Sequence, residues 1–149
     1  MMKTILVLNG PNLNMLGLRE PEVYGSETLA DVEQTCREYG EELGLVIEFQ
    51  QTNHEGQMIE WIHHARRRIA GIVINPGAWT HTSAAIHDAL IAAEVPVIEV
   101  HISNVHRRED FRHFSYVPRV AKGVLAGFGT DGYRMAIQHY ASSLEQSNA

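Results

Sequence analysis

The sequence predicts an α/β protein: a doubly wound, five-stranded parallel β-sheet between two helical layers, forming a three-layer α/β/α sandwich. Five short apolar runs rich in Val and Ile are typical of strands buried on both faces. Helical patterns separate these runs, and this alternation indicates parallel strands joined by right-handed crossovers. The 149 residues suffice for one core, because a chain of this size buries roughly 70% of its unfolded surface.

The apolar runs and the helical periodicity fix the order of the elements. The expected strands are residues 5–8, 45–49, 71–74, 95–100 and 123–128. The expected helices are about residues 28–43, 55–68, 82–93 and 131–144. Elements in this order are typical of the flavodoxin-like fold. We therefore expect one flavodoxin-like domain over residues 1–149, with a frayed tail after Leu144.

The first helix carries two local signals. Thr28 and Asp31 have the spacing of a capping box, in which each side chain bonds the other's backbone amide. Cys36 falls on the apolar stripe of the same helix and is predicted to be a small core residue. As the single cysteine it cannot form an internal disulfide, which fits a reducing compartment.

Charge and hydropathy exclude two classes of partner. The formal net charge of −6 argues against general nucleic-acid affinity, because phosphate binding needs a basic face. No apolar run reaches the roughly 20 residues of a membrane span, and the first residues lack a signal-peptide pattern. We therefore expect a cytoplasmic protein. Of two basic clusters, residues 66–68 suit a helix C-terminus, whereas Arg107, Arg108 and Arg112 have no such structural explanation.

Polar, bendable segments follow four of the predicted strands. They are residues 9–12, 51–54, 75–78 and 101–104. Any one of them is ordinary turn chemistry. Ligands of doubly wound sheets bind beyond the carboxyl ends of the strands, so amides and imidazoles recurring at this edge predict a site there.

The connection over residues 10–26 is longer than the two to six residues that usually join a strand to a helix. We expect it to act as a lid carrying Arg19 and Tyr24. A tyrosine has an unperturbed pKa of about 10, so Tyr24 can act as a base only if a cation favours the phenolate. Arg19 could supply that charge. The alternative is that Tyr24 packs the loop down.

Glu99 and His101 are two residues apart on a predicted strand and therefore share a face. A buried glutamate needs a partner, and His101 is the nearest one. The carboxylate would fix the tautomer of the imidazole, which would make His101 a competent general acid. The alternative is a structural histidine at a strand end.

The segment 75–83 contains a tight Pro-Gly turn, several hydroxyl groups and His81 before a helix. Hydroxyls and free amides at a helix start suit an oxygen-rich or anionic ligand. A well-capped helix with an exposed His81 explains the same residues.

Three other patterns carry little weight. Residues 127–132 match G-x-G-x-x-G but follow the last predicted strand, so a dinucleotide site is not expected. A phosphate-loop pattern is absent from the sequence. The nine histidines form no H-E-x-x-H motif. We predict neither a cofactor nor a metal.

Taken together, the ordered blocks resemble the type II 3-dehydroquinate dehydratases over residues 5–140. The matching blocks are residues 9–14, 16–17, 19–21, 24–25, 51–56, 75–78, 80–83 and 99–104, with Arg112 and Ser115. Trp79 departs from the family pattern, in which a tyrosine is expected in many relatives.

The resemblance implies a cofactor-free trans elimination of water from 3-dehydroquinate through an enolate, in the shikimate and chorismate or quinate pathway. By the same resemblance, Tyr24 removes the C2 proton and Arg19 favours its phenolate. Asn12 helps to hold a water at the enolate oxygen, and His101, oriented by Glu99, protonates the departing C1 hydroxyl.

The resemblance also implies a set of residues that bind the substrate. They are Asn75, His81 and Arg112 for the ring hydroxyls, and Ile102 and Ser103 for the carboxylate. Members of the family assemble as homododecamers, tetramers of trimers, in which Asp88 is expected to reach a neighbour's site.

Two other functions fit the fold class, because fold alone does not decide function. One is a binding module for a flavin or phosphate ligand. The other is a metal-dependent hydrolase that uses the histidines.

Overall fold

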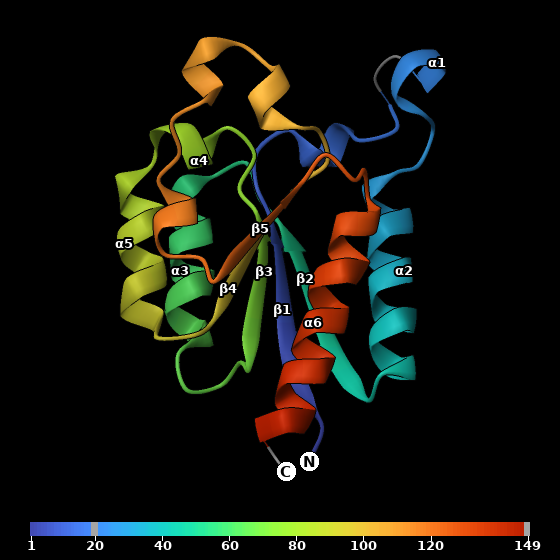
Figure 1. The fold of residues 1–149 in the computed structure, drawn as a ribbon, viewed down its shortest axis with the longest axis vertical. Coiled ribbons are helices and arrows are strands. Elements are labelled where there is room, and N and C mark those ends of the chain that lie inside the picture. Colours follow the sequence, from blue (N-terminus) through green and yellow to red (C-terminus); the bar gives the residue numbers. More distant parts are fainter. Residues whose placement is uncertain (19–20, 148–149) are drawn as a thin grey trace.

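A computed structural model describes residues 1–18 and 21–147, with the backbone alone for Val23, Tyr24 and Ser147 (Figure 1). One parallel sheet has the strand order β2-β1-β3-β4-β5. The strands are β1 (Lys3–Asn9), β2 (Leu45–Gln51), β3 (Gly71–Asn75), β4 (Val97–His101) and β5 (Gly123–Ala126). The predicted doubly wound α/β fold is confirmed.

Helices cover both faces of the sheet. Helices α2 (Leu29–Glu42) and α6 (Asp131–Ser147) lie on one face, and α3 (Glu55–Ala65) and α5 (Ala84–Ala93) lie on the other. Short helical turns occupy the loops: η1 (Leu13–Met15), α1 (Pro21–Tyr24), α4 (Trp79–Thr82), η2 (Val105–Arg107), η3 (Asp110–Arg112) and η4 (Val117–Arg119). Among the described residues, no helix is long and apolar enough to cross a bilayer.

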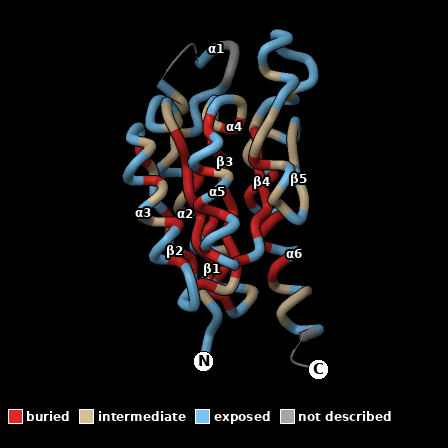
Figure 2. Tube along the Cα trace, turned by 90° about the vertical axis from the view of Figure 1, so that its left-hand side faces the viewer, coloured by how far each residue is buried: buried red, intermediate tan, exposed pale blue. Residues whose placement is uncertain are grey.

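The central strands supply two apolar layers because successive side chains point to opposite faces. Val7 and Val73 pack toward α2 and α6, whereas Leu6 and Ile72 pack toward α3 and α5. Figure 2 shows the resulting column of buried strands, with exposed loops beyond their carboxyl ends. The core therefore lies inside the sandwich and leaves that edge of the sheet open for polar side chains.

The first helix follows its prediction. The Thr28 hydroxyl accepts from the Asp31 amide, and the Asp31 carboxylate accepts from the Thr28 amide. Cys36 is buried in the core under α2. Burial, with Glu33 as a smaller contribution, raises the pKa of its thiol to about 12. Both predictions for this helix are confirmed.

The prediction that every strand is buried on both faces is wrong for the two edge strands. Residues in β2 alternate between buried and exposed, and 42% of Val46 is exposed. In β5, 45% of Val124 is exposed. An edge strand has a single neighbour and incomplete helix cover, and a short apolar run cannot distinguish it from a central strand.

Several boundaries also differ from their predictions. The strand expected from residue 95 begins at Val97, and the strand expected to reach residue 128 ends at Ala126. The helix expected from residue 82 begins at Ala84, because the Ser83 hydroxyl accepts from the Ile86 amide and caps it there. Helix α6 continues to Ser147, so residues 145–147 are helical rather than part of a frayed tail.

Candidate active site

Amide side chains from three strands meet at the carboxyl edge of the sheet. The strand register places Asn9 opposite Gln51 on one side and Asn75 on the other. The amide of Gly10 donates to the Asn75 carbonyl oxygen at 2.8 Å. A Cβ on Gly10 would lie 2.5 Å from the Pro76 carbonyl oxygen, so only glycine allows the two turns to approach so closely.

Asn12 stands at this edge in a left-handed conformation, with φ 71°. Its backbone amide donates to Asn53 Oδ1 at 2.9 Å. The side chain of Gln51 donates both to Asn53 Oδ1 and to the Gly10 carbonyl oxygen, each at 3.1 Å. These contacts from the end of β2 hold an unusual backbone conformation in the turn after β1.

Asn75 is almost fully buried, with 3% exposed. Its Oδ1 accepts from the Gly77 amide at 3.2 Å, and its Nδ2 donates to the Tyr133 hydroxyl at 3.0 Å. The Tyr133 hydroxyl donates in turn to Asn9 Oδ1 at 2.7 Å. Sequence reasoning missed Tyr133, whose only signal was an aromatic residue with a polar tip on the apolar stripe of a helix.

The predicted contact between Glu99 and His101 is present. Both lie on one face of β4, and His101 Nε2 forms a hydrogen bond with Glu99 Oε2. The Thr80 hydroxyl donates to the same oxygen at 2.7 Å. Glu99 is fully buried, and its Oε1 has no partner among the described residues. The carboxylate therefore fixes the orientation of the imidazole from below.

A cavity of about 320 Å³ opens beside this pair. Its lining includes Glu99, His101, Arg112, Ser115 and Arg119. The predicted general acid thus shares a cavity wall with one predicted substrate-binding residue. Asn12, Asn75, His81, Ile102 and Ser103 are not among the described lining residues of this cavity.

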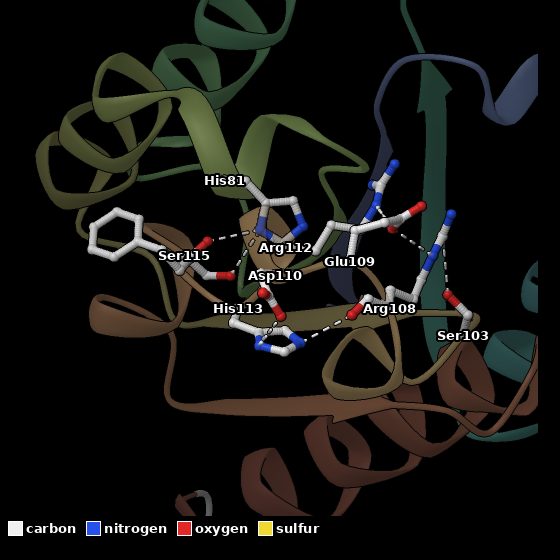
Figure 3. Close-up of polar contacts among 9 residues, drawn as sticks. His81, Ser103, Arg108, Glu109, Asp110, Arg112, His113 and Ser115 are labelled. Atoms are coloured by element: carbon white, nitrogen blue, oxygen red, sulfur yellow. Dashed lines mark hydrogen bonds and ion pairs between the residues drawn. The ribbon is translucent and has the colours of Figure 1, made fainter.

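His81 is tied to the segment that forms the cavity wall (Figure 3). Its Nδ1 lies 2.7 Å from the Phe114 carbonyl oxygen and 3.3 Å from Ser115 Oγ. The Tyr116 amide donates to the Thr80 carbonyl oxygen at 2.7 Å. The chain after β4 therefore folds back onto α4, and it brings His81 and the neighbours of Arg112 together.

Two basic residues of this segment, Arg108 and Arg112, already have partners within the chain. Arg112 Nε donates to Glu109 Oε2 at 2.7 Å, and its guanidinium lies over the Phe111 ring. Arg108 Nη1 donates to Ser103 Oγ at 3.4 Å (Figure 3). The pKa of Glu109 is lowered by its own backbone hydrogen bond and by Arg112. A ligand bound by Arg112 or the Ser103 hydroxyl would have to exchange these partners.

Two predicted site residues lie apart from this cluster. Asp88 is on α5, where 77% of its side chain is exposed and its carboxylate lies 2.9 Å from His87 Nδ1. Ile102 is half-buried and packs against the core on the α2 and α6 side, so only its backbone is suited to a polar ligand.

The predicted base and its cation lie largely beyond what the structure describes. Arg19 is outside the described residues, and Tyr24 is described by its backbone, in α1. Helix α1 stands at the same edge of the sheet as α4 (Figure 1). In residues 1–18 and 21–147, no group of three or more His, Cys, Asp and Glu side chains has metal-binding geometry.

Comparison with known proteins identifies the family. The family model described as "Dehydroquinase class II" matches residues 3–141. The chain belongs to the class II dehydroquinase family. It is 66% identical over 145 residues to 3-dehydroquinate dehydratase 2 of Pseudomonas putida, covering 97% of each protein. It is 59% identical over 145 residues to 3-dehydroquinate dehydratase 2 of Pseudomonas aeruginosa, covering 97% of this chain and 98% of that relative.

A solved structure agrees with the fold. The type II dehydroquinase from Propionibacterium acnes superposes with a TM-score of 0.90 at 50% identity, covering 95% of this chain and 98% of that one. The predicted family, the fold and the enzyme class, a hydro-lyase of the dehydroquinase type, are confirmed. The roles of individual residues stay predictions.

Proposed function

We propose that the chain dehydrates 3-dehydroquinate to 3-dehydroshikimate by trans elimination, with Tyr24 as base and His101 as acid. The observation that carries this proposal is the buried Glu99 carboxylate, which holds His101 at the carboxyl end of β4. A catalytic imidazole needs such an orienting group, whereas a solvent-exposed structural histidine does not.

The elimination proceeds in two steps. The Tyr24 phenolate removes the C2 proton next to the ketone, and the electron pair moves onto the carbonyl oxygen to give an enolate. When the carbonyl re-forms, the C1–C2 double bond forms and the C1–O bond breaks. His101 gives its proton to the departing hydroxyl, which leaves as water. Both groups regain their starting states by exchange with solvent, and no cofactor takes part.

His101 donates the proton from the ring nitrogen that Glu99 does not engage. Glu99 Oε2 bonds Nε2, and Nδ1 makes no hydrogen bond with the described residues. The other carboxylate oxygen of Glu99, Oε1, is buried and has no partner among the described residues. This arrangement supports Nδ1 as the atom that faces the substrate.

The remaining residues bind the substrate and stabilise charge. Asn12 holds a water at the enolate oxygen. A preorganised donor of this kind typically stabilises the transition state by about 3 kcal/mol. Asn75, His81 and Arg112 bind ring hydroxyls. The Ile102 and Ser103 amides, with the Ser103 hydroxyl, bind the carboxylate. Arg19 favours the Tyr24 phenolate when the lid over residues 10–26 closes.

The proposed form of the protein is a cytoplasmic homododecamer, a tetramer of trimers, of single-domain chains, without nucleic-acid or membrane partners. The exposed Asp88 carboxylate on α5 supports a role in a neighbour's site. Light scattering should give a mass twelve times that of the 16.7-kDa chain. A monomeric mass with full activity would contradict the role of Asp88.

The reaction is tested by following the ultraviolet absorbance of the enone product formed from 3-dehydroquinate with a metal chelator present. We expect full turnover in chelator. Loss of turnover in chelator, restored by added metal, would favour a metal-dependent hydrolase instead. A yellow protein or a co-purified nucleotide would favour the binding module.

A further inference from the structure

Tyr133 joins two strand ends at the centre of the site. Its hydroxyl, carried by α6 and fully buried, donates to Asn9 Oδ1 at 2.7 Å and accepts from Asn75 Nδ2 at 3.0 Å. Asn9 ends β1 and Asn75 ends β3. A side chain from the last helix thus bridges two adjacent inner strands directly below the loops of the site.

The direction of each hydrogen bond in this chain is determined. Asn9 Nδ2 donates to the Gln50 carbonyl oxygen at 3.1 Å, so Asn9 Oδ1 is the end that faces Tyr133. The Tyr133 hydroxyl therefore donates its one proton to Asn9 Oδ1, and toward Asn75 it can act only as an acceptor. Burial raises the pKa of the Tyr133 hydroxyl, so the proton stays in place at working pH.

The Asn75 amide is fixed by the same chain. Its Oδ1 faces the Gly77 amide at 3.2 Å and its Nδ2 faces Tyr133. A flipped amide would set Nδ2 against the Gly77 donor and leave Oδ1 against a hydroxyl that has no proton to give. One N–H of Nδ2 and one lone pair of Oδ1 remain for a ligand.

We propose that Tyr133 is a positioning residue for substrate: by fixing the Asn75 amide it determines which ring-hydroxyl contact Asn75 can make. This inference rests on the proposed role of Asn75 in binding the substrate. Tyr133 itself is fully buried beneath the site, so it acts through Asn75. Without its hydroxyl, only the Gly77 amide would hold the Asn75 side chain, so the flipped orientation, which does not suit the substrate, would become more populated.

Tyr140 offers a matched control on the same helix. It is also buried, and its single O–H is shared between the carbonyl oxygens of Ile72 and Pro96, each 2.8 Å from the hydroxyl oxygen. These acceptors lie at the amino ends of β3 and β4, at the end of the sheet opposite the site. Removing either hydroxyl takes one buried group from the core, but only Tyr133 is linked to Asn75.

The experiment compares Tyr133→Phe with Tyr140→Phe by thermal unfolding and by steady-state kinetics on 3-dehydroquinate. Both variants should unfold at a lower temperature. Tyr133→Phe alone should raise KM by about ten-fold, the effect of one lost oriented hydrogen bond, with kcat within about two-fold. An unchanged KM, or an equal rise in Tyr140→Phe, would overturn the proposal.

A double-mutant cycle with Asn75→Ala separates this inference from the function on which it rests. If Tyr133 acts through Asn75, Tyr133→Phe adds no further rise in KM to Asn75→Ala. An additive rise would refute positioning through Asn75 and leave its contact with substrate intact. An unchanged KM in Asn75→Ala alone would remove that contact, and the inference with it.

A second variant covers the case in which Tyr133→Phe does not fold. Asn9→Ala keeps the tyrosine ring and removes the acceptor that commits its proton, so the Tyr133 hydroxyl can then serve either end of the Asn75 amide. We expect the same rise in KM. A KM equal to that of the wild type would count against the proposal.

Discussion

At the scale of single residues, the site depends on one buried carboxylate. Glu99 Oε2 accepts from the Thr80 hydroxyl and bonds His101 Nε2, so Thr80 holds the carboxylate and the carboxylate orients the imidazole. The sequence allowed the Glu99–His101 pair to be predicted, because two residues apart on a strand share a face. It could not reveal Thr80 or Tyr133, because their contacts arise only when separate elements pack together.

Replacing Glu99 with glutamine tests this orientation. An amide of the same shape can turn its NH2 group toward His101 Nε2, which reverses the hydrogen bond and selects the other tautomer. We expect Glu99→Gln to lower kcat by about 100-fold or more while the protein stays folded. Circular dichroism would check the fold, and a kcat like that of the wild type would exclude an orienting role.

Replacing Tyr24 with phenylalanine tests the base. The variant lacks the only group proposed to take the C2 proton but keeps the ring. Turnover should fall by about 100-fold to 10,000-fold, while calorimetry should still detect substrate binding. Retained turnover in Tyr24→Phe would require a different base.

At the scale of elements, the site exists because the turns after β1 and β3 lie against each other. Apolar periodicity predicted every main strand and helix, but it could not separate edge strands from central ones. It also missed the short helical turns that surround the site, such as α4 and η3, because these are set by packing of the loops. The long connection after β1, which contains η1 and α1, was the visible sign of such turns.

Gly10→Ala tests the close approach of those turns. The new Cβ would meet the Pro76 carbonyl oxygen at 2.5 Å, and a backbone atom cannot move aside cheaply. We expect a loss of about 1–3 kcal/mol in the free energy of unfolding and a lower kcat/KM.

Gly56→Ala is the matched control, because its Cβ would have no neighbour within 4 Å. In helix α3 this change should stabilise by about 0.5–1 kcal/mol without affecting kcat/KM. Equal unfolding free energies for the two variants would show that the approach of the turns is not constrained.

At the scale of the whole molecule, the residues of the buried core and those of the candidate site lie in different parts of the fold. The first residues of the chain and the end of α6 lie at one end of the sandwich, and the candidate site lies at the other (Figure 1). The described core includes two tyrosines, Tyr133 and Tyr140, and the thiol of Cys36, each in the layer on the α2 and α6 side of the sheet. Burial raises the pKa of all three groups.

This burial predicts how stability changes in alkali. Each group has a higher pKa folded than unfolded, so the folded state keeps protons that the unfolded state releases. Stability is therefore fully present below about pH 8. It falls first as the Cys36 thiol ionises in the unfolded chain, near its ordinary pKa of about 8.5, and above pH 10 each tyrosine adds a loss of about 1.4 kcal/mol per pH unit. Urea unfolding between pH 8 and about 11 measures this, and Tyr140→Phe should show a shallower fall. A flat profile would be inconsistent with the buried hydroxyls.

The central claim is that an imidazole held by Glu99 protonates the departing hydroxyl, and the turnover of His101→Ala tests it most directly. The measurement is kcat for enone formation from 3-dehydroquinate, on protein shown to be folded. The account predicts a fall of about 100-fold to 10,000-fold relative to the wild type. A kcat within a few-fold of the wild type would contradict it and assign the acid to another group.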